Sequence, residues 1–469
     1  MYLEGSLAHA PLLPKLLTLS FDNLKWLSNN SNSRHMILHL FLSPSILTYR
    51  IVPSNTEQTH QMSQYTVLST LQVITEKCPR LHTLEMYCGP RSNENIGWTE
   101  PESDLLLSCF APLPIRNLST SLFMLENRAL SQLSHLESLE IDLELGSSLD
   151  LFVGHASENQ FSRLRHLALR SIPDFPSFQR IWGLPHLTTQ LTSATLHFSK
   201  CFTQRTTPRI LDSIIVTIHS RGQSIRELSM LCLHIFPDFS YSKIIDWLCS
   251  LFYLQGLRLT AGSSSLVTDP QEGSLKPNYS GIKKLSLPNR RINLRMLQIY
   301  GQKMPNLSYL HVHTIVVSEK CLKSQGELVH RHDFEIHIED IELGRGGSPE
   351  AWDHWSIFVL HLWPNARLHL GPAAQYRKAE WAKKLQKQQK ANKTQPPFHE
   401  YRLNEVELSS FLKITLNPIR FNDNIFRRPI SMYISAISPI QFKPPHIVNM
   451  NLQPTVLNVD SQESLEPGN

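Results

Sequence analysis

Histidines recur at short spacing in the last third of the chain. His311 and His313 lie two residues apart in the segment MPNLSYLHVH. Three more follow soon after: His330, His332 and His337. Side chains two residues apart on a strand share a face, so two imidazoles at this spacing can ligate one metal ion. The pattern predicts, as one alternative, a metal-binding or enzymatic site at His311 and His313. A solvated strand face gives the same spacing in a chain with 22 histidines, and we favour that interpretation.

No motif in the sequence identifies a reaction. GxSxG, HExxH and CxxC patterns are absent. The GRGG run of residues 344–347 lacks the Lys-Ser/Thr of a phosphate-binding loop. The carboxylates of Glu339, Asp340 and Glu342 lie in a strand-like run and indicate a solvated face. We therefore expect a protein that is not an enzyme, with no catalytic residue, no metal, no cofactor and no small-molecule ligand.

Basic residues gather in a segment with helical spacing, residues 373–393. They are Arg377, Lys378, Lys383, Lys384, Lys387, Lys390 and Lys393. Such a helix could contact nucleic acid, which is a second alternative. The net charge of +5 over 469 residues is small, however, and lysines on an exposed helix usually keep it soluble. Nucleic acid is therefore the less favoured partner.

Composition indicates a folded protein in a reducing compartment. Apolar residues make up 41% of the chain and charged residues 18%. The seven cysteines are scattered and odd in number, which favours free thiols over a disulfide framework. No signal peptide precedes Leu16, and the most apolar run, Met36–Val52, is too polar to cross a bilayer. We expect a cytoplasmic or nuclear location and no membrane partner.

A short phrase repeats along the chain. CPRLHTLEMY and MPNLSYLHVH both follow the template apolar-x-x-apolar-x-apolar. The template matches with middle residues Leu19, Tyr49, Leu84, Leu118, Leu139, Leu167, Leu196, Leu228, Leu257, Leu285, Leu310 and Leu368. The first eleven are spaced by roughly 29 residues, a period typical of stacked repeats. The last interval is twice as long and predicts one more unit near Phe334–Ile341.

The repeats predict an α/β solenoid. The end of each phrase alternates as a strand does, and helical spacing precedes several phrases. Helices are expected at Tyr65–Lys77, Ile210–His219, Lys243–Phe252 and Met296–Lys303. A single unit cannot bury its apolar face, so neighbouring units must stack. The expected architecture is a right-handed β-α superhelix with a curved parallel sheet inside and helices outside.

Three segments follow from this pattern. Residues 1–370 hold about 11–12 irregular units, less regular after residue 320. Residues 371–395 form the basic helix. Residues 396–469 have weak helical periodicity with many Pro and Asn residues, and we expect a poorly structured tail.

The residues between the apolar positions should form the concave surface. Acidic candidates come early in the chain: Glu85, Glu140 and Asp142. Candidates that are mostly basic come late: Arg258, Lys284, Tyr309, His311, His313, Arg367 and His369. We hypothesise a concave face that is acidic in its N-terminal half and basic in its C-terminal half. Solenoids bind protein partners on such faces, so we expect a protein partner there.

The phrases KCPRLHTLEMY, LSQLSHLESLEIDL, FSRLRHLALRSIP and QKMPNLSYLHVH resemble the irregular leucine-rich repeats of fungal F-box proteins. The resemblance covers about residues 12–370 and implies a leucine-rich-repeat solenoid that captures proteins for a ubiquitin ligase. In that family an N-terminal F-box of roughly forty residues docks on the Skp adaptor. Here the first repeat begins by Leu16 and no F-box opening is found, so a Skp-type adaptor is not expected as a partner.

Overall fold

The computed structural model describes most of the repeat region and the helix that follows it. The described residues are 11–21, 38–51, 62–88, 98–125, 133–143, 161–199, 208–232, 253–261, 279–317, 333–343, 363–392 and 433–435, with 244–245, 248–249, 251, 355 and 359. They belong to one compact unit, residues 1–435. Among them, no helix is both long and apolar enough to cross a membrane.

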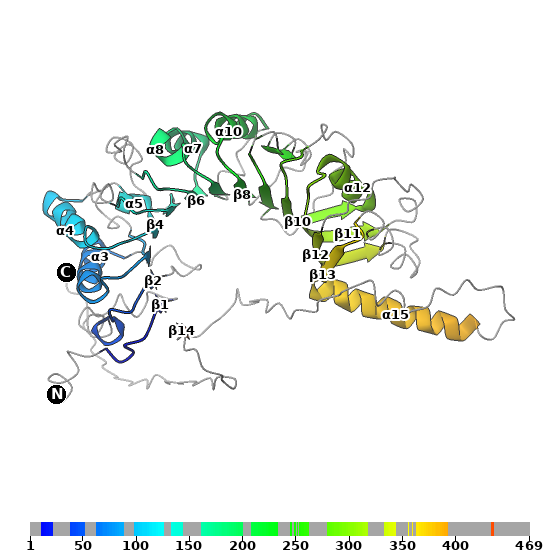
Figure 1. Cartoon of the computed structure of the whole chain (residues 1–469), viewed down its shortest axis with the longest axis horizontal. Coiled ribbons are helices and arrows are strands. Elements are labelled where there is room, and N and C mark those ends of the chain that lie inside the picture. Colours follow the sequence, from blue (N-terminus) through cyan, green and yellow to red (C-terminus); the bar gives the residue numbers. More distant parts are fainter. Residues whose placement is uncertain are drawn as a thin grey trace, which may run out of the picture. The chain divides into compact units, whose positions relative to one another are not determined.

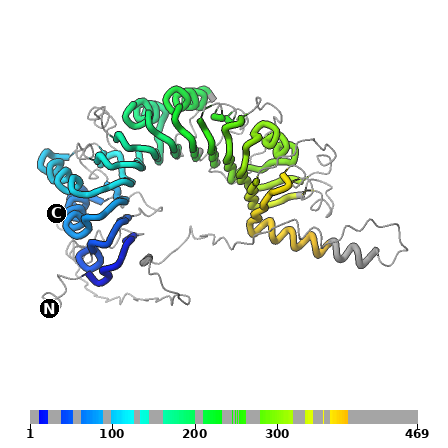
Figure 2. Tube along the Cα trace, viewed as in Figure 1, coloured from blue at the N-terminus to red at the C-terminus, as the bar shows by residue number. Residues whose placement is uncertain are grey.

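Thirteen parallel strands form one sheet in the described part of the chain, and each strand pairs with the next one along the sequence. Their bounds are β1 Thr18–Phe21, β2 Thr48–Ile51, β3 Thr83–Glu85, β4 Asn117–Ser121, β5 Ser138–Asp142, β6 His166–Ile172, β7 Ser193–Phe198, β8 Glu227–Cys232, β9 Gly256–Ala261, β10 Lys284–Asn293, β11 Tyr309–Val317, β12 Phe334–Leu343 and β13 Ala366–Leu370. A short strand, β14 Tyr433–Ser435, pairs antiparallel with β1. Figure 2 shows the chain advancing strand by strand along the sheet.

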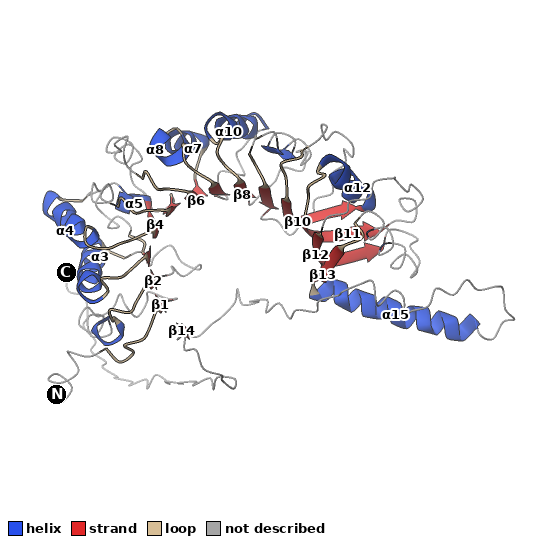
Figure 3. Cartoon of the chain, in the orientation of Figure 1, coloured by secondary structure: helices blue, strands red, loops and turns tan. Residues whose placement is uncertain are grey.

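Helices connect the strands and lie along one face of the sheet (Figures 1 and 3). They are α3 Gln64–Lys77, α4 Glu100–Phe110, α5 Leu122–Leu125, α7 Phe175–Trp182, α8 Pro185–Thr188, α10 Pro208–Arg221 and α12 Leu294–Lys303, followed by the terminal α15 Pro372–Asn392. Side chains cap several of them. Ser63 Oγ accepts from the Thr66 amide at α3, and Asn293 Oδ1 accepts from the Met296 amide at α12. The predicted helices at Tyr65–Lys77, Ile210–His219 and Met296–Lys303 are confirmed as α3, α10 and α12.

The apolar positions of the repeated phrase form the core. Leu307, Leu310 and Val312 are fully buried. The same turn precedes the strand in both phrases, closed by Leu81 N to Cys78 O at 3.1 Å and by Leu307 N to Met304 O at 3.0 Å. In both units the turn leads into a strand whose alternate side chains are buried. The expected α/β architecture with stacked β-α units is confirmed at this level.

The unit expected near Phe334–Ile341 is confirmed as β12, which continues the ladder in register between β11 and β13. The alignment of the unit at Leu196 is wrong by two residues. Leu196 pairs with Leu169 and Met230, so the middle position of this unit is Ala194. A shift of two keeps Leu196 buried, because the side-chain period of a strand is two.

Two other expectations extend over residues that the structure largely leaves out. The helix expected at Lys243–Phe252 includes a few described positions only, of which 244–245 and 248–249 are helical. The tail of residues 396–469 lies outside the described residues except for β14. The poorly structured tail stays a prediction.

Candidate functional site

The face of the sheet opposite the helices, here called the open face, carries a continuous row of side chains. Residues paired in register across the strands form this central row: Ser20, Arg50, Glu85, Ser119, Glu140, Ala168, Thr195, Ser229, Arg258, Ser286, His311, His337 and His369. Apart from Ala168 the row is polar. Because neighbouring strands are about 4.8 Å apart, the ladder places these side chains at a regular interval across the sheet.

All ten predicted site residues fall on the open face. Glu85, Glu140, Arg258, His311 and His369 belong to the central row. Lys284, Tyr309 and Arg367 lie two residues before their row members, and Asp142 and His313 lie two residues after theirs. The alternation of the strands therefore predicted the face correctly, although the chain separates these residues by up to 284 positions, from 85 to 369.

Histidines line up over the last three strands. His311 on β11, His337 on β12 and His369 on β13 are register partners. The rings of His337 and His369 are stacked, with centroids 4.2 Å apart and planes at 10°. The ring of His311 lies 6.2 Å from that of His337 and meets it edge-on. His313, in contrast, turns its Nδ1 to Thr314 Oγ1 at 2.8 Å. The predicted pair of His311 and His313 is therefore replaced by a row across strands.

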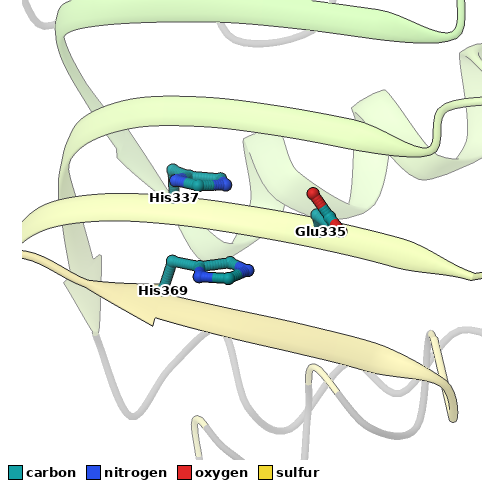
Figure 4. A group of neighbouring side chains, drawn as sticks. All are labelled: Glu335, His337 and His369. Atoms are coloured by element: carbon teal, nitrogen blue, oxygen red, sulfur yellow. The ribbon is translucent and has the colours of Figure 1, made fainter. Parts of the chain in front are cut away.

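Glu335, Tyr309 and Arg367 form the next row along the same strands. Arg367 Nη1 lies 4.0 Å from Glu335 Oε1, a loose ion pair between half-exposed side chains. The Tyr309 ring packs against His337 with centroids 4.9 Å apart. His337 thus contacts rings from both neighbouring strands, Tyr309 on β11 and His369 on β13. Figure 4 shows the two stacked histidines with Glu335 on the side toward which both rings extend.

Burial sets the protonation of this cluster. Desolvation, together with the potential positive charges of the neighbouring His369 and His311, lowers the pKa of His337 from 6.5 to about 4. His311 Nε2 lies 3.3 Å from Glu339 Oε1, and this hydrogen bond lowers the pKa of Glu339 below its usual value. His337 is accordingly neutral and Glu339 ionised at pH 7. Ser286 Oγ, 3.3 Å from His311 Nδ1, occupies the second nitrogen of that ring.

Three side chains of this cluster have the chemistry and spacing of metal ligands. One ligand atom each from Glu335, His337 and His369 lies within 4.8 Å of the others. Nε2 of His369 is shielded from solvent and has no hydrogen-bond partner in the described part of the chain. Two imidazoles and one carboxylate match the donor sets of zinc and similar divalent ions.

A second cluster lies on the early strands. The Tyr87 hydroxyl is 3.3 Å from Glu85 Oε1 and 3.4 Å from Glu140 Oε1. Arg170 contacts Glu140, and Arg50 Nε lies 3.7 Å from Glu85 Oε2. Burial raises the pKa of Glu140, which Arg170 opposes. Glu85 and Glu140 thus each face an arginine, and neither Arg50 nor Arg170 was among the predicted site residues.

Charges of both signs also alternate on the late strands. Lys284 Nζ lies 3.6 Å from Glu227 Oε1, and His311 faces Glu339. Beyond them, Arg291 contacts Glu342. We expected an acidic half and a basic half. Instead, acidic and basic side chains form ion pairs with each other within each half.

The basic helix is present as α15, and its start packs on the sheet. Arg377 Nη2 lies 2.8 Å from Asp340 Oδ2 on β12, and Trp381 is buried. Arg377 is thus held by a structural ion pair, whereas Lys383 and Lys384 are exposed among the described side chains of this helix.

Two residues of the late cluster, Glu335 and His337, were missed as site residues. The signal was present in the alternating run FEIHIED, which places both on one face of a strand. The run escaped the repeat template because its first position is Asp333, which is exposed. Only the pairing of β12 between β11 and β13 brings His337 and His369 together.

Comparison with known proteins adds no assignment. The chain matches no family model, and no curated protein sequence matches it either. The open face and its side chains are therefore the basis for inferring a function.

Proposed function

We propose that the chain is a non-catalytic leucine-rich-repeat protein that binds a protein partner on its open face. The repeated phrase and the stacked β-α units support the repeat class. The resemblance to fungal F-box proteins extends the proposal to its biological role, which is to recognise a protein destined for ubiquitination. The binding role can be tested without the ligase role, because it depends on the open face alone.

The central row is the observation that carries the proposal. One side chain per strand is presented in register from β1 to β13, and the helices lie on the opposite face (Figure 3). The strands use their backbone groups in the ladder, so the side chains are what this face offers to a partner. An extended surface with fixed spacing suits a protein better than a small molecule, which needs an enclosed pocket.

The anchor of this surface lies on β9 to β11. Arg258 is exposed on β9, and Tyr309 is half-buried on β11 with its ring held by His337. Arginine and tyrosine are enriched among residues that dominate binding energy. A tyrosine already held in place loses little rotamer freedom on binding. By contrast, the early carboxylates are engaged with Tyr87, Arg50 and Arg170 and contribute mainly to the shape of that half.

Affinity capture with matched surface variants tests the binding role. The open-face variant combines Arg258→Glu with Tyr309→Ala, and the control is Val216→Ser on the helix side, where Val216 is 65% exposed. A partner of the open face should be captured by the original chain and by Val216→Ser, and lost from the open-face variant. Purified components should then give at least a tenfold weaker affinity for that variant. Equal capture by all three proteins would overturn the proposal.

The ligase role has its own readout. We expect the captured partner to be ubiquitinated less in cells that lack this protein. In addition, a version extended at its N-terminus by an F-box should recover the Skp adaptor. If ubiquitination of the partner is unchanged, the ligase role is wrong while the binding role still stands.

A further inference from the structure

The late end of the open face brings together two histidines and a carboxylate from neighbouring strands. His337 and Glu335 come from β12, two residues apart and on one face, and His369 comes from β13 as the register partner of His337. Their ligand atoms lie within 4.8 Å of one another. In a tetrahedral zinc site with bonds of about 2.1 Å, ligand atoms are roughly 3.4 Å apart. Side-chain torsions of half-buried residues can close that difference without moving the strands.

The environment of His369 is an independent observation that points to a bound ligand. Its Nε2 is shielded from solvent and makes no hydrogen bond within the described residues. A buried polar atom without a partner costs about 1–3 kcal/mol, and a bound water or ion would relieve that cost. Figure 4 shows both rings extending toward the side on which Glu335 lies, so a cation there would face all three groups.

We propose that Glu335, His337 and His369 form a binding site for a divalent transition-metal ion, with zinc as the preferred ion. Two imidazole nitrogens and one carboxylate oxygen are the ligands that zinc takes in open three-ligand sites, where a fourth position is left for water. The donor set disfavours magnesium and calcium, which take oxygen ligands.

The surroundings support this set of ligands over the neighbouring histidines. Arg367 holds Glu335 only loosely, at 4.0 Å. His311 instead has both nitrogens occupied, by Ser286 and Glu339. Tyr309 packs against His337 and orients its ring.

This site does not depend on the proposed partner. It needs three side chains of the chain itself and would hold zinc in the isolated protein. The test therefore uses the full chain without an affinity tag, dialysed against a chelator, with Zn²⁺ and Co²⁺ as probes and Mg²⁺ for comparison. Binding is measured by calorimetry, and the ligand-field absorption of Co²⁺ reports the coordination.

We expect one Zn²⁺ per chain and a four-coordinate Co²⁺ spectrum, with no heat from Mg²⁺. The double variant His337→Ala/His369→Ala should bind Zn²⁺ at least about 100-fold more weakly, and Glu335→Gln should weaken binding by about 10-fold or more. Two controls should keep binding: His311→Ala/His313→Ala, which tests the neighbouring histidines, and His166→Ala, an exposed histidine on β6 of the same face.

Thermal unfolding shows whether each variant is folded. Zinc should raise the melting temperature of the original chain and of both controls, and leave that of the His337→Ala/His369→Ala variant unchanged, since a ligand stabilises only the state that binds it. The proposal is overturned if the original chain binds no zinc. It is also overturned if the double variant binds as tightly as the original, or if only His311→Ala/His313→Ala abolishes binding.

Discussion

The imidazole rings of His337 and His369 lie parallel on adjacent strands, with centroids 4.2 Å apart. Two protonated rings at this distance would repel each other, and desolvation adds to the penalty on a charge at His337. His337 therefore prefers to be neutral. The stability of the late strands should therefore depend on pH. The closeness of the two rings also allows both to bind the same candidate metal ion.

Acid should weaken the fold through His337. Its pKa is about 4 in the folded chain, below the ordinary 6.5. Between these two pKa values the unfolded chain binds more protons, so the free energy of unfolding falls as the pH is lowered through that window. Above it this group adds no pH dependence. Urea unfolding of metal-free protein across this range measures the slope, and histidine NMR titration gives the pKa directly.

Replacing the neighbouring ring provides the control for this effect. His369→Asn removes one of the positive charges that disfavour protonation of His337, so the pKa of His337 should rise and the acid-dependent slope should shrink. An unchanged pKa in this variant would contradict the role assigned to the stacked pair. The substitution Val216→Ser, on the helix side, should change neither quantity.

The core of the ladder should be sensitive to truncation. Leu310 is fully buried between its register partners Leu285 on β10 and Ile336 on β12. Leu310→Ala should lower the free energy of unfolding by about 2–5 kcal/mol, because it removes buried methyl groups and leaves a cavity. Urea denaturation followed by circular dichroism measures the loss. Val216→Ala, at an exposed site, should stay within about 0.5 kcal/mol, and a similar loss in both variants would refute the stacking role of Leu310.

The sequence predicted most of this ladder because buried apolar residues recur with a fixed spacing. Where a unit departs from the template, the prediction failed in a way that the physics explains. The β7 unit has the small Ala194 at its middle position, so the template was aligned on the larger Leu196, two residues later. Since two residues are one full strand period, the inner and outer faces were still assigned correctly.

The candidate site was less predictable than the fold. Tyr309, His311 and His369 were placed on the right surface by alternation alone. The contact between His337 and His369 depends on which strands are neighbours, and that follows only once β12 is recognised as a unit. Pairs such as Arg170 with Glu140 also depend on the register between neighbouring strands. From a single sequence that register can be inferred only by aligning the repeats.

Gly371 should tolerate no side chain. A Cβ at this position would lie 2.9 Å from Glu339 Cα and 3.0 Å from Glu339 O, both of them backbone atoms that cannot rotate away. Gly371 N also donates to Ile338 O at 2.7 Å, which holds the two backbones together. Gly371→Ala should therefore destabilise the fold by about 1–3 kcal/mol in urea unfolding.

A second glycine offers a matched control for that substitution. Around Gly256 on β9 the nearest atom to an added Cβ is the Glu227 Cγ at 3.4 Å, an ordinary contact. Gly256→Ala should leave stability unchanged or raise it by up to about 1 kcal/mol, because alanine restricts the unfolded chain. Equal losses in the two variants would show that the close approach at Glu339 is not the cause.

The ion pair of Arg170 and Glu140 should matter more at neutral than at acidic pH. Burial raises the pKa of Glu140, and Arg170 opposes that rise. Without Arg170 the carboxylate would be half-buried and charged at pH 7, whereas at acidic pH it can take up a proton. Arg170→Ala should destabilise the fold by about 1–2 kcal/mol at pH 7, discounted for the exposure of the arginine, and by less near pH 5.

Arg116 and Glu137 provide the comparison for that pair. Their side chains are about half exposed and 3.8 Å apart, so water screens the interaction. Arg116→Ala should change stability by less than about 1 kcal/mol at either pH. If Arg170→Ala lost the same amount at both pH values, protonation of Glu140 would not be what relieves the broken pair.

The terminal helix α15 should depend on the ion pair between Arg377 and Asp340. Its start packs on β12 and β13, and Arg377 lies 2.8 Å from Asp340, whose side chain is 11% exposed. Asp340 also accepts a hydrogen bond from the Ile341 amide, so its position is fixed by β12. Arg377→Ala would leave a buried carboxylate without its cation and should loosen the helix by about 1–3 kcal/mol.

Hydrogen exchange locates this effect. Protection should fall in residues 372–384 and at β13, the last parallel strand, while strands β2 to β9 keep theirs, because each repeat is stabilised by its immediate neighbours. Lys383→Ala, at an exposed position on the same helix, should leave all protection unchanged. Repeat arrays need a polar cover at each end, and a loss confined to this region would identify α15 as the cover of the β13 edge. A loss spread over the whole sheet would instead show that the ladder unfolds as one cooperative unit.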